Sequence, residues 1–251
     1  MEWYIFPLFF VIGLCAGFID VIAGGGGLIA VPSLLALGIP PHAVLATDKI
    51  QSSFGIFAAT FNFFLKGLVS FKELALGMLC IGIGAGCGTI LILHLKADIL
   101  RVLILILLVF IFFYSLLVPK IGEEDRHARL KPPLFYSVFG FGLGFYDGFF
   151  GPGTGSFLIF SIVTLLGLNM KKAIVHTKVL NSAANLMSLS VFLIAGHVIW
   201  SIGLLMGLGQ MLGAWVGSNL VVRKLEIEFI RKIFLYTVGA TILKLIWDLL
   251  H

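Results

Sequence analysis

The sequence predicts an all-α, polytopic membrane protein, and three properties of the chain indicate this class. Sixty per cent of its 251 residues are hydrophobic, only 12% are charged, and the mean hydropathy is +1.12. A soluble domain has about twice that charged fraction and cannot bury so much apolar surface. Apolar runs of about 20 residues, the length that crosses a bilayer, recur along the chain. Soluble enzymes, nucleic-acid-binding proteins and disordered chains are therefore excluded.

The apolar runs predict full-length helices and two interrupted regions. We expect membrane helices at about 4–23, 43–65, 74–95, 102–118, 133–150, 173–195, 200–222 and 233–250. Glycine runs at 24–27 and 151–155 interrupt the chain after two of these helices, and a short apolar stretch follows each run. Such a stretch of about 11 residues rises about 16 Å, or half a bilayer. Each region is therefore interpreted as a hairpin whose break lies within the membrane.

The two hairpins belong to a predicted internal duplication. Gly17-Phe18-x-Asp20 matches Gly144-Phe145-x-Asp147 at an offset of 127 residues. Offsets of 129 or 130 relate Thr47 to Thr177, Gln51 to Asn181, Gly67 to Gly196 and Arg101 to Arg231. We expect a first repeat at 1–119, a charged cytoplasmic linker at 120–131 and a second repeat at 132–251. Each repeat would hold one broken-helix hairpin and three transmembrane helices, which hydropathy counts as about eight spans in all.

The placement of Lys and Arg predicts that the two repeats are inverted. If each hairpin returns to the side where it began, 12 Lys and Arg fall on one side, in loops 66–72, 119–131, 171–172 and 223–232. The opposite side holds Lys49, Lys96, Arg101 and Lys244. The positive-inside rule then places the first group of loops in the cytoplasm and both termini outside.

The glycine runs are the first candidate for a binding site. Inverted repeats with broken helices are typical of secondary transporters, whose substrate sites lie at the breaks. A helix that begins after a glycine run points free N–H groups and its positive dipole end at the break, where an anion is stabilised. Candidate substrate-binding residues at the breaks are Gly24, Gly25, Gly26, Gly27, Gly151, Gly153 and Thr154. Close helix packing is the alternative role, and it is the expected one for Gly84, Gly88, Gly213 and Gly217.

Asp20 and Asp147 are the acids within the two hairpins. Ionisable groups inside a membrane usually mark function, so both are candidate coupling residues for a proton or sodium ion. The alternative is structural, because each carboxylate could cap loose N–H groups at the neighbouring break. We expect Asp147 to be the more sensitive of the two, since the Tyr146 hydroxyl could stabilise its charged form.

Polar side chains at the start of the following helices complete the candidate site. Thr177, Asn181 and Asn185 recur at helical spacing and therefore share one face, which bonds across helices or lines a cavity. The remaining candidate substrate-binding residues are Thr47, Lys49, Gln51 and Lys178. The two lysines could bind an anion directly or extend to the interface as topology anchors. No metal-ligand cluster, nucleotide loop or catalytic triad is found, so no metal and no cofactor are expected.

Three stretches carry a family resemblance: Gly17 to Pro32, its second copy Gly144 to Pro152, and Thr177 to Trp200. They resemble the TauE/SafE sulfite exporter family. The resemblance implies a multi-pass protein of the bacterial inner membrane that exports a small anion such as sulfite, an organosulfonate or a carboxylate. Its partners would be that anion and the lipid bilayer, without nucleic acid, and a homo-oligomer is left open.

Two other functions remain as alternatives. An ion channel would also need a polar path through the membrane, but no selectivity-filter motif supports it. An intramembrane aspartyl protease would need two facing carboxylates and a Gly-x-Gly-Asp motif, whereas the sequence has Gly144-Phe145-Tyr146-Asp147. We therefore expect a transporter and no enzyme.

Overall fold

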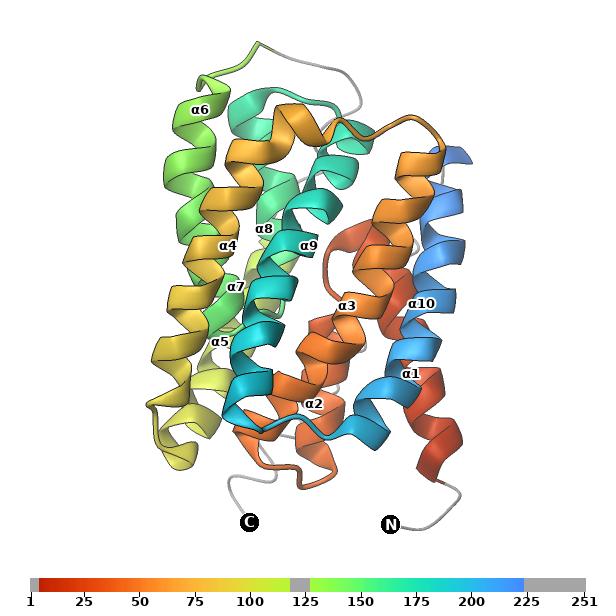
Figure 1. Ribbon diagram of the computed structural model, residues 1–251, viewed down its shortest axis with the longest axis vertical. Helices are drawn as coiled ribbons and strands as arrows, with labels where there is room; N and C mark the ends of the chain where they lie inside the picture. The colour runs from red at the N-terminus through yellow and green to blue at the C-terminus, as the bar shows by residue number, and fades with distance from the viewer. Residues whose placement is uncertain (1–4, 118–126, 224–251) are drawn as a thin grey trace.

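A computed structural model describes residues 5–117 and 127–223, and within these ranges the chain forms helices and loops without strands (Figure 1). The first half holds α1 (Ile5–Ala23), α2 (Gly27–Ala36), α3 (Pro41–Leu65), α4 (Phe71–Leu93) and α5 (Ala97–Leu117). The second half holds α6 (Pro132–Phe135), η1 (Tyr136–Gly140), α7 (Phe141–Phe149), α8 (Thr154–Ser161), η2 (Ile162–Leu166), α9 (Met170–Ala195) and α10 (Trp200–Arg223).

The predicted all-helical membrane fold is confirmed. By length and composition, α1, α4, α9 and α10 can cross a membrane, while α2 and the α8–η2 segment are apolar but shorter. Large apolar side chains on the outside, such as Leu79 and Ile194, are strongly exposed, as lipid-facing residues are. The helix predicted at 233–250 lies outside the described residues, so the count of eight spans stays a prediction.

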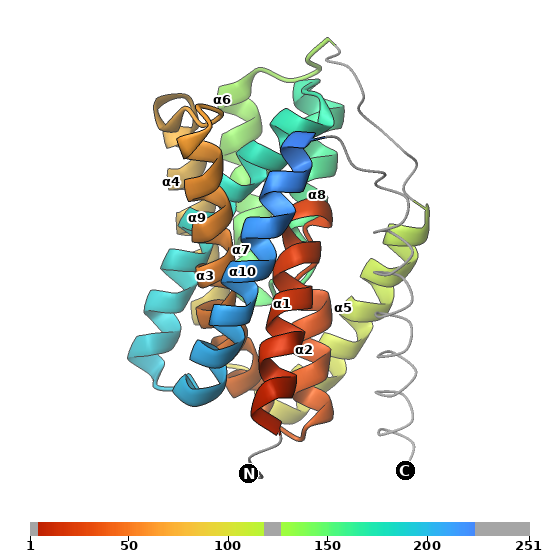
Figure 2. The ribbon, with the colours of Figure 1, turned by 90° about the vertical axis from the view of Figure 1, so that its right-hand side faces the viewer.

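Two helical hairpins enter the bundle from opposite ends (Figures 1 and 2). In Figure 1, α1 rises from the lower end and α2 returns to it, whereas α6, η1 and α7 descend from the upper end and α8 and η2 return there. The second hairpin differs from the first in its two π-helical segments, η1 and η2, which the sequence did not indicate. Both hairpins break inside the bundle, at the predicted glycine runs.

The two ends of the bundle collect the loops that the charge pattern grouped. The α3–α4 connection and the beginnings of α6 and α9 lie at the upper end of Figure 1, and the α2–α3, α4–α5 and α9–α10 connections lie at the lower end. Helices at matching places in the two halves run in opposite directions: α1 against α7, α3 against α9, and α4 against α10. These directions support an inverted duplication, although the repeat boundaries stay a prediction.

Glycines allow each hairpin to pack closely on a helix of the other half. Helix α7 packs on α4, where a Cβ added at Gly84, Gly88, Gly144 or Gly148 would overlap a backbone carbonyl oxygen of the facing helix. Helix α1 packs on α10 in the same way through Gly13, Gly17, Gly209 and Gly213. Small residues that let backbones approach are the usual basis of helix association in membranes. The packing role expected for the small-residue spacings in α4 and α10 is therefore confirmed.

Cysteine labelling tests the placement of the two ends. In a background without the three native cysteines, cysteines at Lys131 and Lys171 should react with an impermeant reagent only from the cytoplasmic side. Cysteines at Lys96 and His197 should react only from outside, because these residues lie in the opposite set of loops. Labelling of all four positions from one side would contradict the placement.

The glycine contacts between α4 and α7 predict a position-dependent stability loss. Gly148→Ala should lower the free energy of unfolding by about 1–3 kcal/mol, because its Cβ would meet the Ala85 carbonyl oxygen and push the helices apart. Gly142→Ala, in the same helix, has open space around the new Cβ and should be neutral or slightly stabilising. Thermal unfolding in detergent measures both, and equal effects would contradict the packing argument.

Candidate functional site

The broken ends of the two hairpins touch at the centre of the bundle. Gly24, with a φ of +72°, lies so close to Gly155 that a Cβ on either residue would overlap the backbone of the other. The backbone N–H of Ser156 donates to the Gly24 carbonyl at 3.3 Å, and its hydroxyl donates to the Ala23 carbonyl at 2.5 Å. These contacts fix the two breaks against each other and place their surroundings in one shared site.

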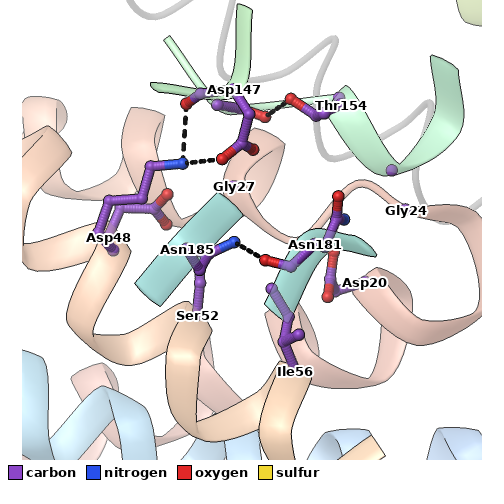
Figure 3. A pocket seen from close by; sticks show the side chains of 14 residues that line it. Asp20, Gly24, Gly27, Asp48, Ser52, Ile56, Asp147, Thr154, Asn181 and Asn185 are labelled. Atoms are coloured by element: carbon purple, nitrogen blue, oxygen red, sulfur yellow. Dashed lines mark hydrogen bonds and ion pairs between the residues drawn. The ribbon is translucent and has the colours of Figure 1, made fainter. Parts of the chain in front are cut away.

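Two buried ion pairs connect each hairpin to a long helix of the other half. Lys49 of α3 binds Asp147 of α7, with 2.6 Å between Nζ and Oδ2 (Figure 3). Lys178 of α9 binds Asp20 of α1, with 2.8 Å between the same atom types. Each ammonium also donates to the backbone carbonyl of its own aspartate, at 2.8 Å for Asp147 and 2.5 Å for Asp20. The two pairs therefore repeat one arrangement in both halves.

These pairs decide several predictions about the charged residues. Lys49 and Lys178 are buried, with 3% and 0% of their surface exposed, so the prediction that they reach the membrane interface is wrong. Their aliphatic stems do not lead outward because both ammonium groups have buried carboxylates to neutralise. Each aspartate faces a lysine rather than the other aspartate, which is not the geometry of an aspartyl protease.

The capping alternative holds for one aspartate. Oδ1 of Asp20 accepts a hydrogen bond from the backbone N–H of Gly26 at 3.3 Å, at the residue before α2 begins. A Cβ on Gly26 would meet the Asp20 side chain, so this glycine permits the capping contact. The expectation for Tyr146 is wrong, because its hydroxyl donates to the Pro152 carbonyl at 2.8 Å and braces the second break instead.

A small polar cavity lies where the hairpin ends meet α3 and α9 (Figure 3). The space open to the centres of water molecules is about 20 Å³, enough for about one water. The predicted residues that line it are Asp20, Gly24, Gly27, Lys49, Asp147, Gly151, Gly153, Thr154, Asn181 and Asn185. The lining residues that sequence reasoning did not select are Asp48, Ser52, Ile56 and Gly155.

Six predicted residues do not line the cavity: Gly25, Gly26, Thr47, Gln51, Thr177 and Lys178. Thr47 accepts a hydrogen bond from the backbone N–H of Ile199 at 3.2 Å, near the lower end of the bundle. Gln51 donates to Asp48 at 2.8 Å and thus supports a lining residue from behind. Lys178 reaches the site only through its ion pair with Asp20.

The cavity also corrects the register of the duplication in α3 and α9. Lys49 and Lys178 occupy equivalent places and are 129 residues apart, as are Ser52 and Asn181. The offset of 130 that related Gln51 to Asn181 is therefore wrong by one residue. The correct offset was a usable signal, because Gly67 and Gly196 already follow it.

The side chains around the cavity favour binding over covalent chemistry. Oδ1 of Asn181 and Oδ1 of Asn185 are buried acceptors without a hydrogen-bond partner among the described residues. The orientation of the Asn185 amide is fixed, because its Nδ2 donates to the Asn181 carbonyl at 3.1 Å. Within the described ranges no group of His, Cys, Asp and Glu could hold a metal ion. The unpaired amide oxygens and the charged groups can instead hold a small polar ligand.

Comparison with known proteins agrees with this picture. A relative from Escherichia coli strain K12, "Probable membrane transporter protein YfcA", is 42% identical over 241 residues, which are 96% of this chain and 89% of the relative. "Probable membrane transporter protein" of Haemophilus influenzae is 41% identical over 217 residues, 86% of this chain and 85% of the relative. "Probable membrane transporter protein ORF9" of a Sinorhizobium species is 41% identical over 251 residues, 100% of this chain and 96% of the relative.

The family comparison covers both halves of the chain. Residues 9–245 match the family described as "Sulfite exporter TauE/SafE". Its members and the relatives above are membrane transporters and not enzymes, as the sequence motifs predicted. The chain therefore belongs to the TauE/SafE sulfite exporter family.

Proposed function

We propose that this membrane transporter is a secondary transporter that exports a small anion, such as sulfite, an organosulfonate or a carboxylate, across the bacterial inner membrane. The observation that carries this proposal is the single buried polar cavity at the meeting point of two broken helices. Secondary transporters place their substrate site where broken helices of inverted repeats meet. The family and the relatives support transport in general, and the choice of an anion rests on the site.

Two features of the cavity suit an anion. Two of the three N–H donors of Lys49 serve Asp147, and the ammonium lines the cavity, where its third donor can reach a substrate. Thr154 begins α8 and also lines the cavity, so the positive end of that helix is directed at the site. We therefore assign the direct anion contact to Lys49 and the start of α8, and a supporting role to Lys178.

The size of the cavity implies movement during transport. Room for about one water is too little for a sulfite ion with its four heavy atoms, so the described conformation is a closed one. Substrate would enter when one hairpin end moves away from α3 or α9. The Asp–Lys pairs span those boundaries, and each would hold its side of the site closed until the substrate competes for the ammonium. Proton coupling through Asp20 or Asp147 stays a prediction.

Transport by purified protein in liposomes tests the function. Efflux of sulfite, a small organosulfonate and a small carboxylate should be measured separately, with choline as a cationic control. At least one anion should be transported, and it should also raise the melting temperature, since a ligand at 100 times its Kd adds about 2.7 kcal/mol of stability. Transport of choline and of none of the anions would contradict the proposal.

The two ion pairs should respond differently to removal. Lys49→Met or Lys178→Met alone should destabilise the protein by about 3–5 kcal/mol, because each leaves a buried carboxylate without its partner. Combining each change with Asp147→Asn or Asp20→Asn, respectively, should recover most of that stability, as measured by thermal unfolding.

Transport then separates the roles of the two lysines. The folded Lys49→Met/Asp147→Asn variant should lose anion transport, because the ammonium that lines the cavity is gone. The folded Lys178→Met/Asp20→Asn variant should retain a substantial part of it, since Lys178 does not line the cavity. Equal transport by the two double variants would contradict the assignment of the anion contact to Lys49.

A further inference from the structure

The cavity holds one more carboxylate than its lysines neutralise. Asp20, Asp48 and Asp147 all line it, and the described partners of the two nearby ammonium groups are Asp20 and Asp147. Asp48 is 4% exposed, and its printed hydrogen bond comes from the neutral amide of Gln51 at 2.8 Å. A buried carboxylate without a counter-charge is costly in a membrane interior, so the site favours a positive charge or a proton at this position.

The unpaired amide oxygens point to the same kind of ligand. Oδ1 of Asn181 and Oδ1 of Asn185 belong to side chains that are 4% and 3% exposed, and both residues line the cavity beside Asp48 (Figure 3). These atoms only accept hydrogen bonds. An anion would satisfy neither of them, whereas a proton-bearing group or a bound cation would.

We propose that Asp48 is the residue that binds the coupled proton during anion transport. The assignment rests on the proposed function, and it adds a group to the two aspartates that the sequence singled out. Asp20 and Asp147 already have lysine partners, so their protonation would break an ion pair, whereas protonation of Asp48 removes an uncompensated charge.

Asp48 is placed to release the proton as well as to bind it. Its Oδ2 lies beside Gly27, the first residue of α2, where the positive end of the helix stabilises a negative charge. The charged groups that face it are Lys49 on its own helix, Asp20 on α1, Asp147 on α7 and Lys178 on α9 through its pair with Asp20. When a hairpin end moves, the balance of these charges at Asp48 changes, and with it the affinity for the proton.

The duplication provides only one such group. At the offset of 129 residues set by the two lysines, the equivalent of Asp48 is Thr177, which cannot ionise. The site is therefore asymmetric in its titratable groups, although the ion pairs are symmetric. One proton for each anion is the expected stoichiometry at this position.

Asp48→Asn in liposomes tests the proposal, with sulfite as the probe. The variant should exchange sulfite between the two sides at equal pH, but an imposed pH gradient should no longer drive its accumulation. Asp98→Asn, the same change at an exposed position of α5, should behave as the wild type in both assays and controls for the acid–base chemistry of sulfite itself. Accumulation by Asp48→Asn equal to that of the wild type would overturn the proposal.

A second measurement does not depend on transport. The melting temperature of the purified protein should be followed from pH 5 to 8 for the wild type, Asp48→Asn and Asp98→Asn. The wild type should lose stability relative to Asp48→Asn as the pH rises, because the ionised carboxylate is then buried without a partner. Parallel pH profiles would reject a titrating Asp48 even if sulfite is transported, and a failure of sulfite transport with divergent profiles would reject only the substrate.

Sodium is distinguished in the same experiment. Replacing choline chloride with sodium chloride at constant ionic strength should leave the wild-type melting temperature unchanged at each pH. A rise with sodium that Asp48→Asn lacks would overturn the proton in favour of a sodium ion at this carboxylate.

Discussion

Four charged side chains in an apolar interior impose the main constraint on this structure. A lone lysine or aspartate at that depth is strongly unfavourable, so each must meet an opposite charge. Here each lysine binds both the carboxylate and the backbone carbonyl of its aspartate, near the end of a broken helix, where carbonyls lose their helical partners. The ammonium thus neutralises a charge and completes the end of a helix at once, and the positions of both hairpins follow from these contacts.

The glycines allow the geometry that the ion pairs require. Close contact of α1 with α10 and of α7 with α4 brings each hairpin deep into the opposite half, and the contact of Gly24 with Gly155 joins the two breaks. The resulting cavity is small because backbone meets backbone there. Tight packing of this kind tends to have two discrete arrangements rather than a continuum, which suits a protein that must alternate between closed and open states.

The helices and the two breaks could be predicted from the sequence because hydropathy and glycine runs are local signals. The partners of the charged residues could not, because Lys49 and Asp147 are 98 residues apart and Lys178 and Asp20 are 158 apart. Periodicity placed Asn181 and Asn185 on one face and matched the cavity, but it also included Thr177, which points elsewhere on the same helix. Ile56 gave no signal, since an apolar residue in a membrane helix is unremarkable in sequence. The π-helical segments arise from packing and leave no clear pattern.

The crossing of the ion pairs has a consequence for biogenesis. The ribosome delivers α1 and α3 to the membrane before α7 and α9 exist, so Asp20 and Lys49 must wait for partners that are synthesised later. During that interval the first half is held in the bilayer with two unmatched charges, and it cannot reach its final packing alone. Insertion of the second half supplies both partners together, which makes the assembly of this protein a late and cooperative event rather than a stepwise one.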